Sequence, residues 1–274
     1  MKVFVFTYDR YDSITTSGML EEAGVEHTVL CHTEEQKQSF IDGGRVLPNR
    51  IVATGMPRGL AYNRNYALEL MGEGEWALFL VDDLKSLTEL RNYDTAKSPL
   101  PITMANQRAY KDRFDKEIDA AAFMKRAEEL VKLCEMNNCY LGGWCGINNP
   151  PFRADHYKVN VLADGRAWIV KKSHLRFDEN AQMIDDLCWT AQNIQEFGMV
   201  IVDQWLLPDC RRYSKGAFGS IEERMPQKLA EAAYLVKAYP SLIAFKEKTG
   251  WPYGSHVVLR QQRKKPKISG VRNK

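Results

Sequence analysis

One short hydrophobic run in the first third of the chain sets the pattern for the rest. Six apolar residues at 76–81 are followed directly by Asp82 and Asp83. A continuous apolar run of this length is typical of a buried central strand in a mostly parallel sheet. Such sheets bind ligands beyond the carboxyl ends of their strands. The pattern therefore predicts that both acids lie at the mouth of a crevice, where a cation or donor network must neutralise them.

The residues before this run alternate between strand and helix patterns. The expected strands lie at 2–6, 25–30 and 50–53, and the expected helices at 13–23, 34–41 and 57–71. This order predicts an α/β unit of nucleotide-binding character. The first strand is not followed by GxGxxG, which weighs against a dinucleotide-binding domain, and the lack of GxxxxGK[ST] excludes a P-loop.

The second half has a less regular pattern. The expected elements are a loop or lid at 91–115, a helix at 116–138, a hairpin of strands 159–161 and 167–171 turning at 163–165, a helix from 185 to 198, a strand at 199–202, a loop at 208–224, and helices at 227–239 and 242–248. Three glycines around Trp144 indicate either a tight bend or a backbone that approaches a ligand closely.

Arg64 stands near the start of an expected helix, where the helix dipole already supplies positive charge. We expect either a bound diphosphate or a carboxylate such as Asp82 or Asp83 to offset this cost. The alternative is an ordinary surface arginine.

Charge is distributed unevenly along the 274 residues. The net charge is +3, but residues 260–274 hold seven basic side chains and no acid, so residues 1–259 carry −4. This basic tail either contacts phosphate groups or is a solvated, flexible end. The apolar segments are all shorter than the roughly 18 residues needed to span a bilayer, and the N-terminal one is too short for a signal peptide. We expect a cytoplasmic protein without membrane contact.

The six cysteines form no CxxC pair, which favours reduced thiols. Zinc binding by Cys134, Cys139 and Cys145 with a histidine is the alternative, although their spacing fits no usual zinc pattern. His256 stands in an expected loop rich in ligand-competent groups and is either a metal ligand or a surface residue.

Taken in order, several motifs resemble those of GT-A-type glycosyltransferases. The motifs are Thr7-Tyr8-Asp9-Arg10, Arg64-Asn65, Asp82-Asp83, Phe177-Asp178-Glu179 and Asp185-Asp186. The match covers residues 1 to about 205. Two motifs depart from the family pattern, since Asp82-Asp83 replaces Asp-x-Asp and Asp185-Asp186 replaces Glu-Asp.

The resemblance implies an α/β fold with a GT-A-like mixed, mostly parallel sheet flanked by helices. It implies one glycosyltransferase domain at 1–205, with a nucleotide half at 1–90 and an acceptor half at 91–205. A helical C-terminal extension at 206–259 and a flexible basic tail at 260–274 would follow.

The resemblance also implies a binding site for a nucleotide-sugar donor, with a UDP-sugar favoured. Thr7 and Tyr8 would line the nucleobase site, and Arg10 would flank it. Arg64, together with the basic tail, would complement the charge of the diphosphate.

The implied cofactor is Mn²⁺ or Mg²⁺, which would neutralise the leaving diphosphate. Asp83 would be the direct metal ligand, Asp82 would face the ribose or the metal, and His256 is a candidate third ligand. Asp186, or else Asp185, would be the general base of an inverting transfer.

Within the family, the chain resembles the TET/JBP-associated glycosyltransferases found in phage genomes. Their expected acceptor is a hydroxymethylated pyrimidine in DNA, such as 5-hydroxymethylcytosine, and the basic tail and aromatic loops suit a nucleic acid. One alternative is a sugar-1-phosphate nucleotidyltransferase, which would need a glycine-rich loop after the first strand. Another is a non-catalytic nucleic-acid-binding protein with a GT-A-like fold.

Overall fold

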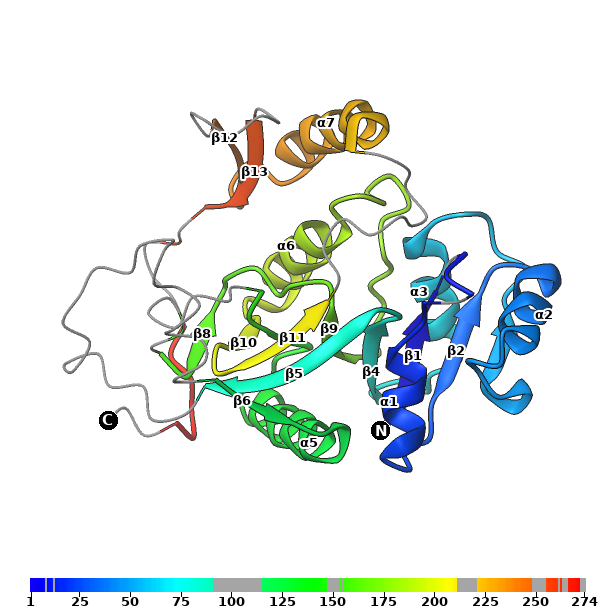
Figure 1. Ribbon diagram of the computed structural model, residues 1–274. Coiled ribbons are helices and arrows are strands. Elements are labelled where there is room, and N and C mark those ends of the chain that lie inside the picture. The colour runs from blue at the N-terminus through cyan, green and yellow to red at the C-terminus, as the bar shows by residue number, and fades with distance from the viewer. Residues whose placement is uncertain are drawn as a thin grey trace, which may run out of the picture.

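A mixed sheet of eight strands forms the centre of the computed structural model (Figure 1). The model describes residues 1–7, 9–11, 13–90, 115–146, 153, 155–210, 221–247, 255–260, 262 and 266–271. Across the sheet, the strands are β3 (Ile51–Ala53), β2 (Thr28–Cys31), β1 (Lys2–Phe6), β4 (Trp76–Val81), β9 (Ala167–Lys171), β7 (Leu141–Trp144), β10 (Ile201–Asp203) and β8 (Tyr157–Val159). Only β9 and β8 run against the common direction. The predicted α/β class with a mixed, mostly parallel sheet is confirmed.

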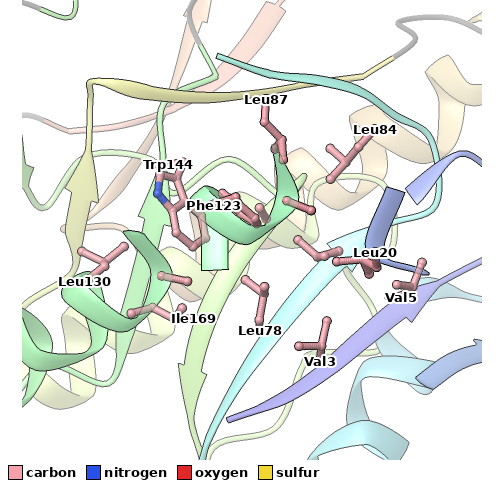
Figure 2. Close-up of a cluster of buried hydrophobic side chains, with 14 of the residues drawn as sticks. Val3, Val5, Leu20, Leu78, Leu84, Leu87, Phe123, Leu130, Trp144 and Ile169 are labelled. Carbon is pink, nitrogen blue, oxygen red and sulfur yellow. The ribbon is translucent and has the colours of Figure 1, made fainter. Parts of the chain in front are cut away.

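Helices cover both faces of this sheet. They are α1 (Thr16–Glu22), α2 (Glu34–Asp42), α3 (Leu60–Glu69), α5 (Ala120–Met136), α6 (Asp185–Phe197) and α7 (Ile221–Ala238), with a short 3-10 helix η1 (Pro48–Arg50). Alternate residues of a strand point to opposite faces. Val3 and Leu78 therefore join one core with Phe123 of α5 (Figure 2), whereas Phe4 and Phe79 join the other core with α3 and α6. Burial on both faces explains why residues 76–81 are continuously apolar.

A smaller antiparallel sheet lies beside the large one. It consists of β11 (Leu206–Cys210), β5 (Leu84–Leu90) and β6 (Asp115–Ile118). Since β5 begins three residues after β4 ends, Asp82 and Asp83 form the link between the two sheets. The amides of Thr15 and Thr16 donate to the main-chain oxygen of Asp82, at 2.9 and 3.1 Å, so the start of α1 holds this link in place.

The C-terminal part combines α7 with a hairpin of β12 (Ile243–Glu247) and β13 (Ser255–Leu259). Leu235 of α7 and Ile243 are fully buried and belong to the same core as Leu187 of α6. The predicted helix at 242–248 is wrong where the structure describes it. A short apolar run does not distinguish a strand from a helix turn.

Two other predictions for the second half are wrong. The strands β8 and β9 do not pair as a hairpin, because β8 pairs with β10 and β9 lies between β4 and β7. Residues 141–144 form the buried strand β7, so the tight bend offered as one alternative around Trp144 is wrong. The glycines of β7 serve packing, since a Cβ at Gly142 would lie 2.6 Å from Cγ1 of Ile169.

The predicted loops are corrected in part. Of the predicted loop at 91–115, Asp115 begins β6, and 91–114 lie outside the described residues. Of the predicted loop at 208–224, the first three residues end β11 and the last four begin α7, and 211–220 lie outside the described residues.

Candidate functional site

Two of the predicted site residues, Thr7 and Asp82, meet at the carboxyl edge of the large sheet. Strands β1 and β4 are parallel neighbours with Phe6 opposite Val81, so the residues that follow them lie side by side. The hydroxyl of Thr7 donates to Oδ2 of Asp82 at 2.6 Å, and both side chains are buried. Tyr8 lies outside the described residues.

Arg10 bridges the two aspartates. Its Nη1 lies 2.6 Å from Oδ1 of Asp82 and 2.7 Å from Oδ2 of Asp83. Burial raises the pKa of the Asp82 carboxyl to about 6, while Arg10 and Thr7 oppose the rise. Burial also raises the pKa of Asp83, and Arg10 opposes that rise too. One guanidinium thus supplies positive charge to two carboxylates that desolvation makes harder to ionise.

Arg166, immediately before β9, is a further charged residue near Asp83 at this edge of the sheet. Its Nε lies 3.0 Å from Oδ1 of Asp164, and its guanidinium donates to the main-chain oxygens of Gly146 and Pro208 at 3.1 and 3.0 Å. The charge of Arg166 also lowers the pKa of Asp83. Arg166 therefore connects the carboxylate pair after β4 to Asp164.

Sequence reasoning missed Arg166 and Asp164 as site residues. Arg166 directly precedes β9 and Asp164 lies two residues before Arg166, and β9 runs antiparallel to β4. The beginning of an antiparallel strand lies at the carboxyl edge of its neighbour, so the signal was present. The predicted hairpin placed residues 163–165 in a turn, and a hairpin turn need not lie at this edge of the sheet.

Arg64 is buried beneath the site rather than exposed on its surface. Its Nη1 forms an ion pair with Asp185, its Nη2 donates to the main-chain oxygen of Gly165 at 3.2 Å, and its guanidinium lies 4.3 Å from the centre of the Trp168 ring. Burial lowers the pKa of Arg64 to about 9, and the charge of Asp186 opposes that effect. The expectation that Asp82 or Asp83 offsets its charge is corrected, since Asp185 at the start of α6 is the ion-pair partner.

Asp186 lies at the start of α6 beside the Asp164 turn. Its Oδ1 accepts from the amide of Leu187 at 2.8 Å. A Cβ placed on Gly165 would lie 3.2 Å from Cβ of Asp186, so the turn packs against this aspartate. Burial, followed by the charge of Asp164, raises the pKa of Asp186 to about 6. At neutral pH the group is an ionised carboxylate with a higher than usual proton affinity, which suits a general base.

Polar side chains also connect the ends of β2 and β3. Nε2 of the His32 ring lies 3.2 Å from Nδ2 of Asn63, and Oδ1 of Asn63 accepts from the hydroxyl of Thr54 at 2.7 Å. Gln36 donates to Asp9 at 2.8 Å. These contacts extend the polar edge from Thr7 towards the outer strands, on the side where the nucleobase is expected.

A further buried polar network follows β10. Arg126 lies 2.9 Å from Nε2 of His156 and 3.3 Å from Oδ2 of Asp203. The His156 ring stacks on Trp205 with centroids 4.0 Å apart. Burial raises the pKa of Asp203 to about 6. No pattern in the sequence pointed to this network, which unites Arg126 of α5, Asp203 of β10 and His156 immediately before β8.

The predicted metal ligands are brought together only in part. Asp82 and Asp83 are adjacent and offer the hard oxygen donors that Mg²⁺ and Mn²⁺ prefer. His256 is placed by its backbone in β13 opposite Lys246, so its expected loop is corrected to a strand. The described residues contain no group of three histidine, cysteine or acidic side chains that could hold a metal ion. The two carboxylates therefore fit a divalent cation in chemistry, and water and diphosphate oxygens would have to complete its coordination.

Comparisons with known proteins do not identify a family. No protein-family model matches the chain, and no curated protein is significantly similar to it. Among the described helices, none is both long and apolar enough to cross a membrane.

Proposed function

We propose that the protein is a GT-A-type glycosyltransferase that moves a sugar from a nucleotide-sugar donor to a hydroxyl acceptor. One observation carries the proposal: stretches far apart in the chain converge at one edge of the sheet. The strand ends after β1 and β4 supply Thr7, Arg10, Asp82 and Asp83, and the start of α6 supplies Asp186. The same residues stand in the ordered motifs that resemble those of GT-A-type glycosyltransferases.

The donor half of the site offers two kinds of charge. Arg10 and Arg166 are cations that can face a diphosphate, and such preorganised charge stabilises a leaving phosphate group. Asp82 and Asp83 would hold Mg²⁺ or Mn²⁺, which supplies electrophilic stabilisation of the diphosphate when bound. A UDP-sugar remains the favoured donor.

Asp186 is the proposed general base. The acceptor oxygen forms a bond to the anomeric carbon while the bond from that carbon to the diphosphate oxygen breaks. The acceptor proton passes to the Asp186 carboxylate, and the nucleoside diphosphate leaves with the bonding electron pair. Asp185 is less suited to this step because it is committed to Arg64.

A hydroxymethylated pyrimidine in DNA is the proposed acceptor. The seven basic residues at 260–274 support this choice, because positive charge favours contact with a phosphate backbone. A phage-encoded protein acting in the host cytoplasm would meet this acceptor.

The test is a transfer assay with purified protein, hydroxymethylated duplex DNA and a panel of UDP-, GDP- and ADP-sugars with Mn²⁺ or Mg²⁺. The expected result is an increase in acceptor mass by one sugar, together with release of nucleoside diphosphate. Pyrophosphate release from a nucleoside triphosphate and a sugar 1-phosphate would instead identify a nucleotidyltransferase. DNA binding without turnover of any donor, in the panel and in hydrolysis assays, would identify a binding protein.

A further inference from the structure

The Arg10 side chain lies where two carboxylates converge. A single nitrogen, Nη1, is 2.6 Å from Oδ1 of Asp82 and 2.7 Å from Oδ2 of Asp83. Oxygens of neighbouring carboxylates that face one point are a usual arrangement around a bound cation. In this structure the cation at that point is a guanidinium.

We propose that Arg10 and a divalent cation compete for this one position, so that the ion binds as the Arg10 side chain leaves. This inference rests on the proposed function, because it concerns the donor half of the same site. It adds a residue that controls whether the carboxylate pair is open to metal.

Asp82 is held in place independently of Arg10. Asp82 accepts from Thr7 through its other oxygen, and its main-chain oxygen is fixed by the amides of Thr15 and Thr16. The backbone of Arg10 is anchored separately, since its oxygen accepts from the amides of Ser13 and Ile14 at 3.2 and 3.1 Å. The Arg10 side chain can therefore move without dismantling either its own turn or the link between the sheets.

The exposure of the three side chains points the same way. The side chain of Arg10 is 20% exposed, against 6% for Asp82 and 8% for Asp83. The guanidinium lies at the mouth of the site, and the carboxylates lie beneath it. The Arg10 guanidinium, on its long and flexible side chain, is therefore the group that can be displaced.

The charge balance gives the exchange a consequence. Two ionised carboxylates and one guanidinium leave the cluster with one net negative charge, which repels a diphosphate. A divalent ion in place of Arg10 brings the pair to neutrality and frees a positive side chain beside it. Metal and nucleoside diphosphate should therefore strengthen each other's binding.

The test is Mn²⁺ binding to the full chain, without donor or acceptor, measured by titration calorimetry and by the loss of the free-ion electron paramagnetic resonance signal. Arg10→Gln should bind Mn²⁺ at least tenfold more tightly than the wild type. Arg10→Lys, which keeps a competing positive charge, should remain close to the wild type. Equal or weaker binding by Arg10→Gln, or equal tightening by Arg10→Lys, would overturn the proposal.

Arg50→Gln is the matched control. Arg50 is also a partly buried arginine paired with two carboxylates, Glu21 at 3.1 Å and Glu26 at 3.3 Å. Its substitution removes the same charge away from the site and should leave Mn²⁺ affinity unchanged. Asp83→Asn added to Arg10→Gln should remove the tight binding.

Other outcomes remain decisive. If Arg10→Gln unfolds alone, millimolar Mn²⁺ should restore folding by circular dichroism, because the ion supplies the missing charge, and failure to do so would contradict the proposal. If no variant binds Mn²⁺, the competition is refuted. Sugar transfer that persists in excess chelator would then leave the proposed function standing by itself.

Discussion

Arg64 and Arg10 both pair with aspartates at the same edge of the sheet, yet their surroundings differ. Arg64 is 1% exposed, lies over Trp168, pairs with Asp185 and donates to a main-chain oxygen. Arg10 is 20% exposed and bridges two carboxylates through a single nitrogen. One arginine is enclosed by the fold, and the other covers the mouth of the site.

The difference assigns the two arginines to different tasks. A buried guanidinium that is stacked and paired cannot leave without exposing an uncompensated charge, so Arg64 positions the start of α6. The Arg10 guanidinium is 20% exposed and can move into solvent when another cation takes its place between the carboxylates, so Arg10 can respond to ligands. The family resemblance implies a donor-binding role for both arginines, and their burial in the structure separates them.

The largest expected effect is on turnover and concerns the two neighbouring aspartates of α6. Asp186→Asn should lower the transfer rate by roughly 10²- to 10⁴-fold, because it removes the proposed base. Asp185→Asn should chiefly lower stability, because it leaves Arg64 without its partner. Steady-state transfer rates and urea denaturation of both variants measure the separation. A loss of rate confined to Asp185→Asn would reverse the assignment of the base.

The next effect is on folding stability and compares the arginines directly. Arg64→Gln should lower the free energy of unfolding by roughly 3–5 kcal/mol, since breaking a buried ion pair leaves Asp185 unpaired. Arg10→Gln should cost less, roughly 1–3 kcal/mol, because the Arg10 side chain is 20% exposed although the two carboxylates that lose it are buried. Urea denaturation at pH 7 gives both values. Similar losses in the two variants would contradict the distinction between a positioning and a displaceable arginine.

Most residues at the carboxyl edge of the large sheet could be predicted from the sequence, but few of their contacts could. Thr7, Asp82 and Asp83 were predictable because each follows an apolar strand of a parallel unit, and parallel strand ends share one edge. Asp185 and Asp186 were predictable only as the start of a helix. The partner of Arg64 was not predictable, because the segment holding Asp185 reaches it only through tertiary packing.

Short and glycine-containing strands account for most errors in the fold. The strand β7 contains Gly142 and Gly143, which suggested a bend, although they are required by the closeness of Ile169 and Ala163. The order of β9 between β4 and β7 has no local signature, and this order brings Arg166 and Asp164 into the site. The order of the strands in the sheet, rather than the type of any residue, therefore places Arg166 and Asp164 at the site.

The third effect is on the pH dependence of folding stability and concerns Asp82, one of the two carboxylates that Arg10 bridges. The folded-state pKa of Asp82 is about 6, above its ordinary 3.8, so the folded state binds its proton more tightly. Its contribution to stability is therefore complete below pH 4 and is lost as the pH rises to about 6, at roughly 1.4 kcal/mol per pKa unit. Asp82→Asn should make the measured decline between pH 4 and pH 7 shallower in urea denaturation, while the part due to Asp186 and Asp203, whose pKa values burial also raises to about 6, remains. Asp155→Asn, at a side chain 75% exposed, is the control and should keep the wild-type slope.

The smallest effect concerns Asp164, which pairs with Arg166 and lies close enough to Asp186 to affect its pKa. Its charge raises the pKa of Asp186, so Asp164→Asn should shift the acidic limb of the rate profile to lower pH, by less than about one unit. The direction follows because a neutral neighbour no longer disfavours ionisation of the base. The plateau rate above pH 7 should change far less than in Asp186→Asn, since Asp186 is then ionised in both proteins. A shift to higher pH would contradict this assignment, because both the loss of the Asp164 charge and the release of Arg166 from its 3.0 Å contact with Asp164 should favour ionisation of Asp186.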